Sequence, residues 1–186
     1  MGNCYESNDY IEADYNGVHF KQADICIQNQ SRNGKSTLFR GRWMMFDFNK
    51  EFKTNMQIVH KSFSNSANPN SIFNKPEFKY KSIKVENDNF NKSFIIRAQD
   101  DHEVFYILTP HFMENMLQLS SNVGKQMMFC FINSQLYVAI YTNKDSFENN
   151  AYNKIDPKVE KEEIVKDISL ITAFVDELNL DRQLFK

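Results

Sequence analysis

Two Asn-Gly dipeptides near the amino end constrain the fold of this chain more than any other feature. Asn16-Gly17 and Asn33-Gly34 each separate segments in which apolar and polar residues alternate. Asn-Gly is the strongest short-range signal for a two-residue hairpin turn, because both residues tolerate a positive φ. The flanking segments YIEADY, VHFKQADICIQNQ and STLFRGRWMMFDF therefore predict a meander of antiparallel strands.

Further short segments extend the predicted sheet. NMQIVHK, KYKSIKVEN and KSFIIRAQ have the length and apolar content of strands. KQMMFCFI and QLYVAIYT predict another hairpin, which turns at Asn133-Ser134. The segment from Ser62 to Pro76 is polar and rich in Asn, and we therefore expect it to be a loop.

Helical signals begin at Asp100. The segment DDHEVFYIL predicts a short helix with Asp100 as its N-cap and Glu103 three residues later. Thr109-Pro110 supplies the cap and the first helical residue of a second helix. The apolar stripe of this second helix is spaced 4-3-4 and comprises Phe112, Met116, Leu119 and Val123.

A long final helix is predicted to begin at Asp156-Pro157. Its apolar stripe is spaced 4-3-4-3 and comprises Ile164, Ile168, Ile171, Val175 and Leu178. We expect this stripe to pack against the sheet of the same domain, with a partner helix as the alternative.

The fold prediction is one α+β domain over residues 9–186, after an N-terminus, residues 1–8, that is disordered or derived from an expression vector. It has a mostly antiparallel sheet, short central helices and a long C-terminal helix. A pleckstrin-homology-like half-barrel capped by that helix is the alternative arrangement.

Composition narrows the class of protein. With 186 residues, of which 41% are hydrophobic and 14% aromatic, the chain has the composition of one folded domain. Its net charge of −2 gives no electrostatic case for nucleic-acid binding. Cys4, Cys26 and Cys130 stand far apart without zinc spacing, which favours a reducing, cytoplasmic compartment. No apolar run approaches the roughly 20 residues of a transmembrane helix, and no signal peptide is expected.

One stretch is more basic than the rest of the chain. The bases between Gln30 and Lys61 are Arg32, Lys35, Arg40, Arg42, Lys50, Lys53 and Lys61, against Asp47 and Glu51. Arg40 and Arg42 share one face of a predicted strand that becomes apolar later, so we expect that face to begin exposed. The candidate binding residues for an anionic partner are Arg40, Arg42, Lys50 and Lys53. An ordinary solvated face is the alternative interpretation.

No assembled catalytic or metal motif is predicted. NGKST resembles the end of a phosphate-binding loop, but Asn29 stands where that loop needs Gly, and the segment joins two strands. The acids of DDHE are explained by helix capping without a metal. The four histidines, His19, His60, His102 and His111, share no local spacing, so a dispersed catalytic triad stays open. We predict no catalytic residue, no metal ligand and no cofactor.

Several segments in order resemble a bacterial family, the domain of unknown function 3137 family. The most specific is TLFRGRWMMFDFNKEFK, followed by VFYILTPHFMENMLQL, QMMFCFINSQLYVAIYTNKDSFE and ITAFVDELNL; DYIEADYNGVHFKQADI precedes them. The resemblance implies a bacterial protein without an established activity, cofactor or catalytic residue. It also implies, for many members, hydrophobic membrane-spanning segments ahead of this region. We therefore expect a cytoplasmic domain, either a soluble member or the soluble part of an inner-membrane protein.

The leading functional hypothesis is a non-catalytic interaction or scaffold module that binds a protein partner or an anionic membrane surface. It rests on the missing catalytic motifs, the amphipathic final helix and the basic strand. One alternative is a hydrolase-type enzyme with a dispersed His/carboxylate site. A second is a small-ligand sensing domain with an aromatic cavity between the sheet and the final helix. The sequence does not specify an oligomeric state.

Overall fold

The computed structural model describes residues 2–32, 34–47, 53–66, 80–123, 126–143, 157–178 and 180. Its strands are β1 (Cys4–Tyr15), β2 (Val18–Ser31), β3 (Gly34–Asp47), β4 (Met56–His60), β5 (Lys81–Ile83), β6 (Phe94–Ala98), β7 (Met127–Ile132) and β8 (Gln135–Tyr141). Its helices are α1 (Lys61–Ser66), α3 (Asp88–Ser93), α4 (Asp101–Ile107), α5 (Pro110–Val123) and α6 (Pro157–Glu177). The chain is therefore an α+β protein, as predicted.

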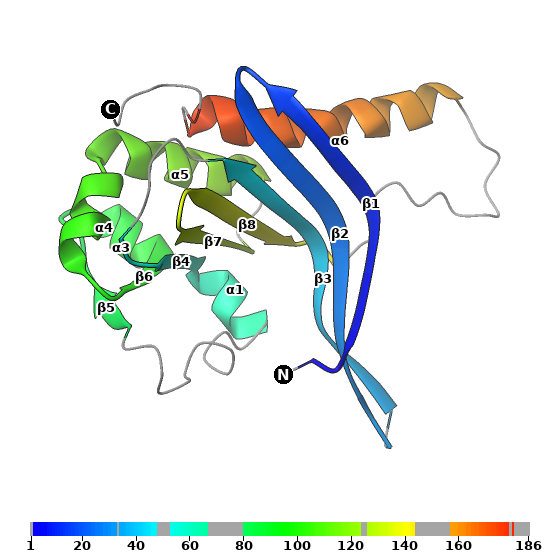
Figure 1. The fold of residues 1–186 in the computed structure, drawn as a ribbon, viewed down its shortest axis with the longest axis horizontal. Coiled ribbons are helices and arrows are strands. Elements are labelled where there is room, and N and C mark those ends of the chain that lie inside the picture. Colours follow the sequence, from blue (N-terminus) through cyan, green and yellow to red (C-terminus); the bar gives the residue numbers. More distant parts are fainter. Residues whose placement is uncertain are drawn as a thin grey trace.

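The eight strands form one sheet in the order β1-β2-β3-β8-β7-β4-β6-β5, and their pairings are antiparallel (Figure 1). This confirms the predicted antiparallel sheet. The sheet is open, with β1 and β5 at its two edges, so the half-barrel alternative is not confirmed.

Local turn chemistry sets the predicted meander β1-β2-β3. Asn16 and Gly17 have φ values of 50° and 78°, which is the positive-φ pair that a tight hairpin needs. Ser31 pairs with Gly34 across the second hairpin, so NGKST joins two antiparallel strands and is no phosphate loop. Asn133, with φ of 55°, turns β7 into β8 as expected.

Two expectations about irregular segments were wrong. Of the two alternatives for residues 1–8, disorder is wrong for Cys4 to Asn8, which belong to β1 and pair with β2 from Gln28 to Asp24; their origin from an expression vector stays a prediction. The predicted loop from Ser62 contains α1 at its start, because the His60 ring accepts a hydrogen bond from the Ser62 N–H at 3.2 Å and caps the helix. The rest of that loop, from residue 67, lies outside the described residues.

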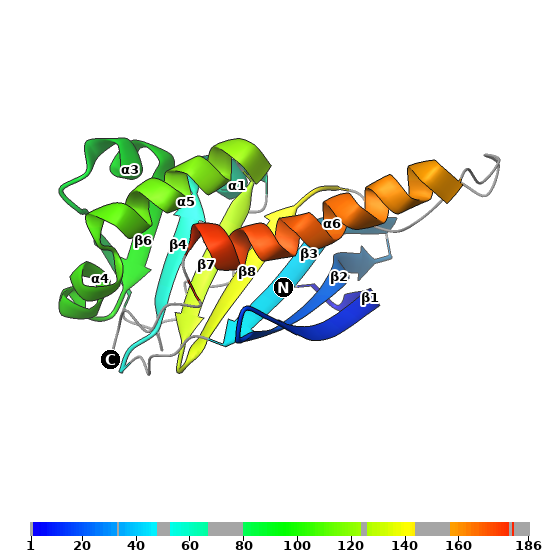
Figure 2. The same ribbon diagram turned by 90° about the horizontal axis from the view of Figure 1, so that it is seen from above.

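Helices α5 and α6 lie side by side across one face of the sheet (Figure 2). The predicted α5 stripe packs inward: Phe112, Met116 and Leu119 are buried, and Val123 is partly buried against the same core. The α6 ring of Phe174 contacts Phe46 at 6.1 Å and Phe129 at 6.3 Å between ring centroids. Aromatic rings thus fill the space between sheet and α6, which argues against a ligand cavity there.

Only the later part of α6 packs as its stripe predicts. Ile171, Val175 and Leu178 are buried, whereas Ile168 is 48% exposed. The side chain of Ile164 and the predicted cap Asp156 lie outside the described residues. The amino end of α6 extends past the edge strand β1, so the sheet is not wide enough to cover it (Figure 1). Within the described residues, no helix is both long and apolar enough to span a membrane.

The opposite face of the sheet carries a smaller apolar cluster. It centres on Phe39 and includes Val59, Met128 and Ala139 from neighbouring strands. Phe63 of α1 covers part of it, with its ring centroid 6.3 Å from that of Phe39. Trp43 is half-buried at the edge of this cluster, so it is less enclosed than the core position that its strand pattern suggests.

Candidate interaction surface

The predicted basic surface does not include Arg42. Arg42 is only 2% exposed, and its Nε lies 3.7 Å from the Asp24 Oδ1 of the neighbouring strand. The expectation that Arg42 lies on an exposed part of its strand was therefore wrong. The physical reason is topological: β3 lies between β2 and β8, and its Arg42 face is the one that continues through Met44 into the core under α6.

Gln22 completes a buried polar cluster with Asp24 and Arg42. Gln22 is 1% exposed, and within the described part of the chain neither its amide nitrogen nor its amide oxygen has a hydrogen-bond partner. All three residues lie on the helix-covered face of β2 and β3. A buried amide without partners is destabilising by roughly 1–3 kcal/mol, so this cluster is a departure from ordinary core composition.

The other predicted basic residues are not gathered at one place. Arg40 is half-buried, and its backbone oxygen accepts from the backbone N–H groups of Thr142 and Asn143. Lys53 is exposed, but its backbone N–H donates to the Glu103 Oε1 of α4 at 2.7 Å. Lys50 lies outside the described residues. The structure thus separates Arg40 on β3 from Lys53 beside α4 and does not bring the set together.

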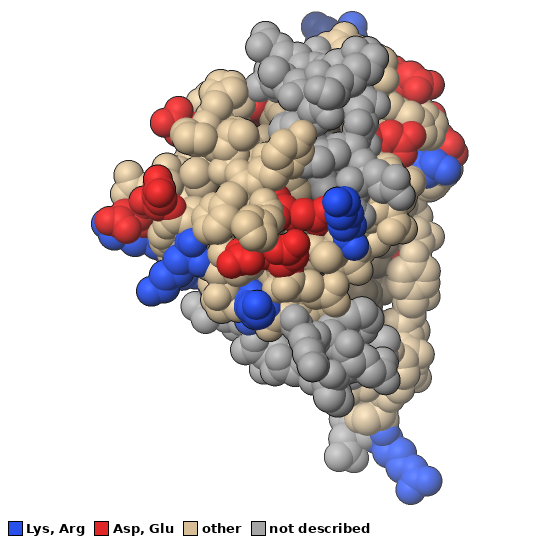
Figure 3. All heavy atoms as spheres, turned by 60° about the vertical axis from the view of Figure 1, so that its left-hand side comes forward, with Lys and Arg blue, Asp and Glu red and all other residues tan. Residues whose placement is uncertain are grey.

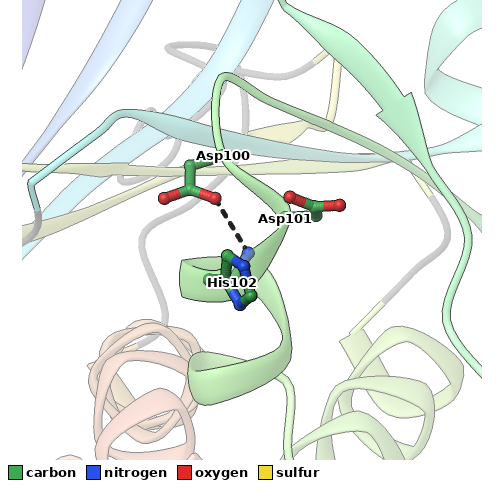
Figure 4. A group of neighbouring side chains, drawn as sticks. All are labelled: Asp100, Asp101 and His102. Carbon is green, nitrogen blue, oxygen red and sulfur yellow. Dashed lines mark hydrogen bonds between the residues drawn. The ribbon is translucent and has the colours of Figure 1, made fainter.

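The start of α4 confirms the capping prediction for Asp100. Its carboxylate accepts the His102 backbone N–H at 3.0 Å (Figure 4). Ligand-type atoms of Asp100, Asp101 and His102 lie within 4.8 Å of one another, but the Asp100 carboxylate is already engaged as the cap. Asp101 and His102 are exposed, and the side chains diverge from the helix start (Figure 4). Capping explains this group without a metal ion.

Glu103 has a role that the capping pattern did not predict. Its carboxylate accepts from the backbone N–H groups of Lys53 and Thr54, at 2.7 and 2.9 Å, and from the Thr54 hydroxyl at 2.9 Å. Through these bonds Glu103 ties α4 to the segment that enters β4. Charge-assisted bonds of this kind hold α4 in a fixed position on the body of the domain.

The outer face of α4 exposes two large aromatic side chains. Phe105 is 52% exposed and Tyr106 is 50% exposed, whereas every other phenylalanine that the structure describes is buried. Val104 and Ile107 of the same helix are buried and anchor it. On a helix Asp101 neighbours Phe105, and His102 neighbours Tyr106, because residues four apart lie one turn above each other. We call Asp101, His102, Phe105 and Tyr106 the α4 patch.

The surroundings of the α4 patch are acidic. From Asp100 to Glu114 the chain has four acids, Asp100, Asp101, Glu103 and Glu114, and no Lys or Arg. Figure 3 views the side of the molecule on which α4 lies, and there Asp and Glu side chains border a tan surface, with Lys and Arg side chains beside them. A signal for this patch existed in the sequence. The run Val104–Leu108 has five consecutive apolar residues, and a helix on a surface cannot bury all of them.

The histidines lie on separate elements of the fold. His19 contacts Glu12 at 3.1 Å and Asp14 at 3.2 Å on the β1-β2 hairpin. His60 is buried beside Phe94 and accepts the Ser62 hydroxyl at 2.7 Å together with the Ser62 N–H. This pair has the residue types of a nucleophile and its base, but here the imidazole serves as a helix cap. His102 and His111 lie on α4 and α5.

The comparisons with known proteins agree with the resemblance read from the sequence. A family model described as "Protein of unknown function (DUF3137)" matches residues 37–180, which is most of the chain. The chain belongs to this family. The match begins within β3 and includes the α4 patch and α6, whereas β1 and β2 precede it.

Other comparisons add little about this member of the family. No curated protein matches the chain. Among solved structures, the chain is similar to the mycobacterial trehalose monomycolate transport factor A, TtfA, with 6% sequence identity and a TM-score of 0.46. That likeness covers 94% of this chain and 73% of the other. A likeness at this level supports no argument about function.

Proposed function

We propose that this domain is a non-catalytic interaction module that docks a protein partner on the α4 patch. The observation that carries the proposal is the exposure of Phe105 in a protein whose other described phenylalanines are buried. Burying an aromatic side chain stabilises a folded protein by roughly 1.5–3 kcal/mol. Because Phe105 and Tyr106 are half exposed, this domain lacks much of that stabilisation at both rings. Aromatic residues are also frequent among the few residues that dominate protein interfaces.

The way α4 is held supports a binding role. Asp100 caps the helix, Glu103 ties it to Lys53 and Thr54, and Val104 and Ile107 are buried beneath it. The two rings are therefore presented by a fixed helix rather than by a mobile loop. A surface organised before binding loses less conformational entropy on association, which favours affinity.

The proposal locates this role in the cytoplasm, at the inner face of a bacterial membrane. Its supports are the free thiols of Cys4, Cys26 and Cys130 and the membrane-spanning segments that the family resemblance implies for many members. An anionic membrane as the direct partner is less favoured, because Arg42 is buried and the α4 patch is acidic. Sedimentation with anionic vesicles, comparing the natural protein with Arg40→Ala and Lys53→Ala, tests that version.

Site-specific crosslinking in the native host tests the docking surface. A benzoylphenylalanine crosslinker replaces Phe105 in one variant and Ile168, which is similarly exposed on α6, in the control. We expect a protein adduct from position 105 that is absent from position 168. The partner is then purified, and Phe105→Ala should weaken its binding about tenfold or more, the effect of losing roughly 1.4 kcal/mol. Equal effects from Phe105→Ala and Ile168→Ala would contradict the proposal.

A further inference from the structure

We infer that the α4 patch recognises an arginine-bearing segment of its protein partner. The inference rests on the proposed function and goes beyond it by naming the chemistry of the occupant. Three features of the patch carry it: an uncommitted carboxylate, an exposed aromatic ring one helical turn away with a second ring beside it in the chain, and further acids on α4.

Asp101 supplies the uncommitted carboxylate. The neighbouring acids are engaged, since Asp100 caps the helix and Glu103 holds Lys53 and Thr54. Within the described residues, Asp101 accepts no hydrogen bond and forms no ion pair, whereas the Asp100 carboxylate beside it is bonded to the His102 N–H (Figure 4). It lies in the first turn of α4 and is exposed. Its negative charge is therefore available to a ligand.

The rings and the carboxylate together match a guanidinium group. Phe105 lies one turn after Asp101, so a planar cation above the ring can also reach the carboxylate. Arginine stacks on aromatic faces and donates two parallel hydrogen bonds to a carboxylate, whereas the compact lysine ammonium does neither as well. A cation over an aromatic ring contributes about 0.5–1 kcal/mol at an exposed site. These contacts together favour arginine over lysine.

The charges carried by α4 itself favour a cationic partner and oppose an anionic one. Asp100 and Glu103 add negative charge at the start of α4, Glu114 follows on α5, and the exposed Lys53 meets Glu103 through its backbone N–H. His102 and His111 are the other titratable groups on α4 and α5 near it. Lipid headgroups and nucleic acids carry negative charge, and this field repels them. A basic protein segment is the class of macromolecule that fits.

Matched short peptides test the arginine preference directly. The probes are acetyl-Ala-Arg-Ala-Arg-Ala-Arg-Ala-amide and its counterparts with lysine or with citrulline, the neutral isostere of arginine. Binding to the ¹⁵N-labelled full chain is followed by NMR titration at low salt. We expect shifts centred on residues 101–106, an arginine peptide that binds about threefold to tenfold more tightly than the lysine peptide, and no saturable binding of the citrulline peptide.

Two variants and two controls assign the effect to the patch. Asp101→Asn should weaken the arginine peptide about fivefold to tenfold at low salt and less at high salt, since salt screens exposed charges. Phe105→Leu should weaken it about threefold at both salt concentrations. Asp88→Asn, at an exposed first-turn aspartate of α3, and Ile168→Ala should change nothing. Arginine and citrulline peptides that bind equally, or binding unchanged by Asp101→Asn, would overturn the inference.

The outcomes separate this inference from the proposed function. If Phe105→Ala weakens the crosslinked partner but Asp101→Asn does not, the docking surface stands and the arginine inference fails. If neither substitution affects the partner, both fail. Lys53→Ala gives an additional check, because removing a bordering positive charge should strengthen the arginine peptide about twofold. A weaker complex after Lys53→Ala would contradict the charge argument.

Discussion

The sheet face beneath α5 and α6 is apolar at one end and carries a polar group at the other. On β4, β7 and β8 the buried side chains of this face include Met56, Ile58, Phe129, Phe131 and Val138. On β2 and β3 the same face adds Val18, Phe20, Met44 and Phe46, but it also carries a polar group, Gln22, Asp24 and Arg42, buried to the same degree. Both ends belong to one continuous sheet, and α6 crosses from one to the other (Figure 2).

The difference teaches that burial in this domain does not require apolar residues, provided that opposite charges face each other. Strand register makes this possible, because Asp24 is the Cα partner of Arg42 across β2 and β3. Gln22 has no such complement, since its register partner is Met44. Taking polar groups out of water is unfavourable unless they are paired. The two ends should therefore respond in opposite ways when apolar and polar side chains are exchanged.

Phe174→Ala at the apolar end should have the largest effect. The Phe174 side chain is fully buried between Phe46 and Phe129, so its removal leaves a cavity as well as losing apolar burial. We expect the free energy of unfolding to fall by about 3–5 kcal/mol, measured by urea denaturation. Val165→Ala, on the exposed side of the same helix, is the control and should change it by less than about 0.5 kcal/mol.

Arg42→Met at the polar end should lower the free energy of unfolding by about 3 kcal/mol, the low end for breaking a buried pair, because Met retains part of the packing. The remaining Asp24 charge is the reason for the loss. The double change Arg42→Met with Asp24→Leu should restore most of the stability or exceed it. A single variant that unfolds at the same urea concentration as the natural protein would contradict the pairing argument.

Gln22→Leu should act in the opposite direction and by less. Both amide atoms of Gln22 are buried without partners among the described residues, so an apolar side chain of similar size removes an unsatisfied group. We expect the free energy of unfolding to rise by about 1–2 kcal/mol. Gln57→Leu is a suitable comparison, because the Gln57 Nε2 donates to the Met128 Sδ at 3.0 Å and that contact would be lost. A lower free energy of unfolding for Gln22→Leu would contradict this and would mean that the Gln22 amide makes a stabilising hydrogen bond.

Features of the fold that depend on neighbouring residues in the chain were predictable. The hairpin at Asn16-Gly17 and the caps at Asp100 and Thr109 follow from two to four residues each. The burial of Arg42 does not, because it depends on β8 and α6, which lie about 90 residues or more further along the chain. Ile168 repeats the spacing of its buried neighbours, and only the width of the sheet decides its exposure.

The candidate site was less predictable than the fold for a related reason. The sequence identified the α4 helix and its cap, but the exposure of Phe105 depends on which side of α4 the body of the domain occupies. The basic residues were grouped by their closeness in the sequence. Arg40 and Arg42 do share one face of β3, but that face enters the core at Arg42, and Lys53 lies beyond the end of β3. Neighbours in the chain thus enter different environments in both elements, and the packing of the whole domain decides which of them reach the surface.

The reactivity of Cys130 extends the comparison to the other face of the sheet, with the smallest effect on the folded protein. Although part of the residue is exposed, burial of the thiol raises the pKa of Cys130 to about 12, and a hydrogen bond from Gln57 offsets a little of that rise. The thiolate is the reactive form, so iodoacetamide at pH 8 should alkylate Cys130 about a thousandfold more slowly in the folded than in the unfolded protein. Site-resolved mass spectrometry with and without urea measures this ratio.

Because the Cys130 thiol keeps its proton to a higher pH in the folded than in the unfolded protein, its contribution to stability is complete below about pH 9 and declines as the pH rises towards 12. Equal rates in both states would show that Cys130 lies outside the apolar cluster around Phe39 and that this face of the sheet is open to solvent.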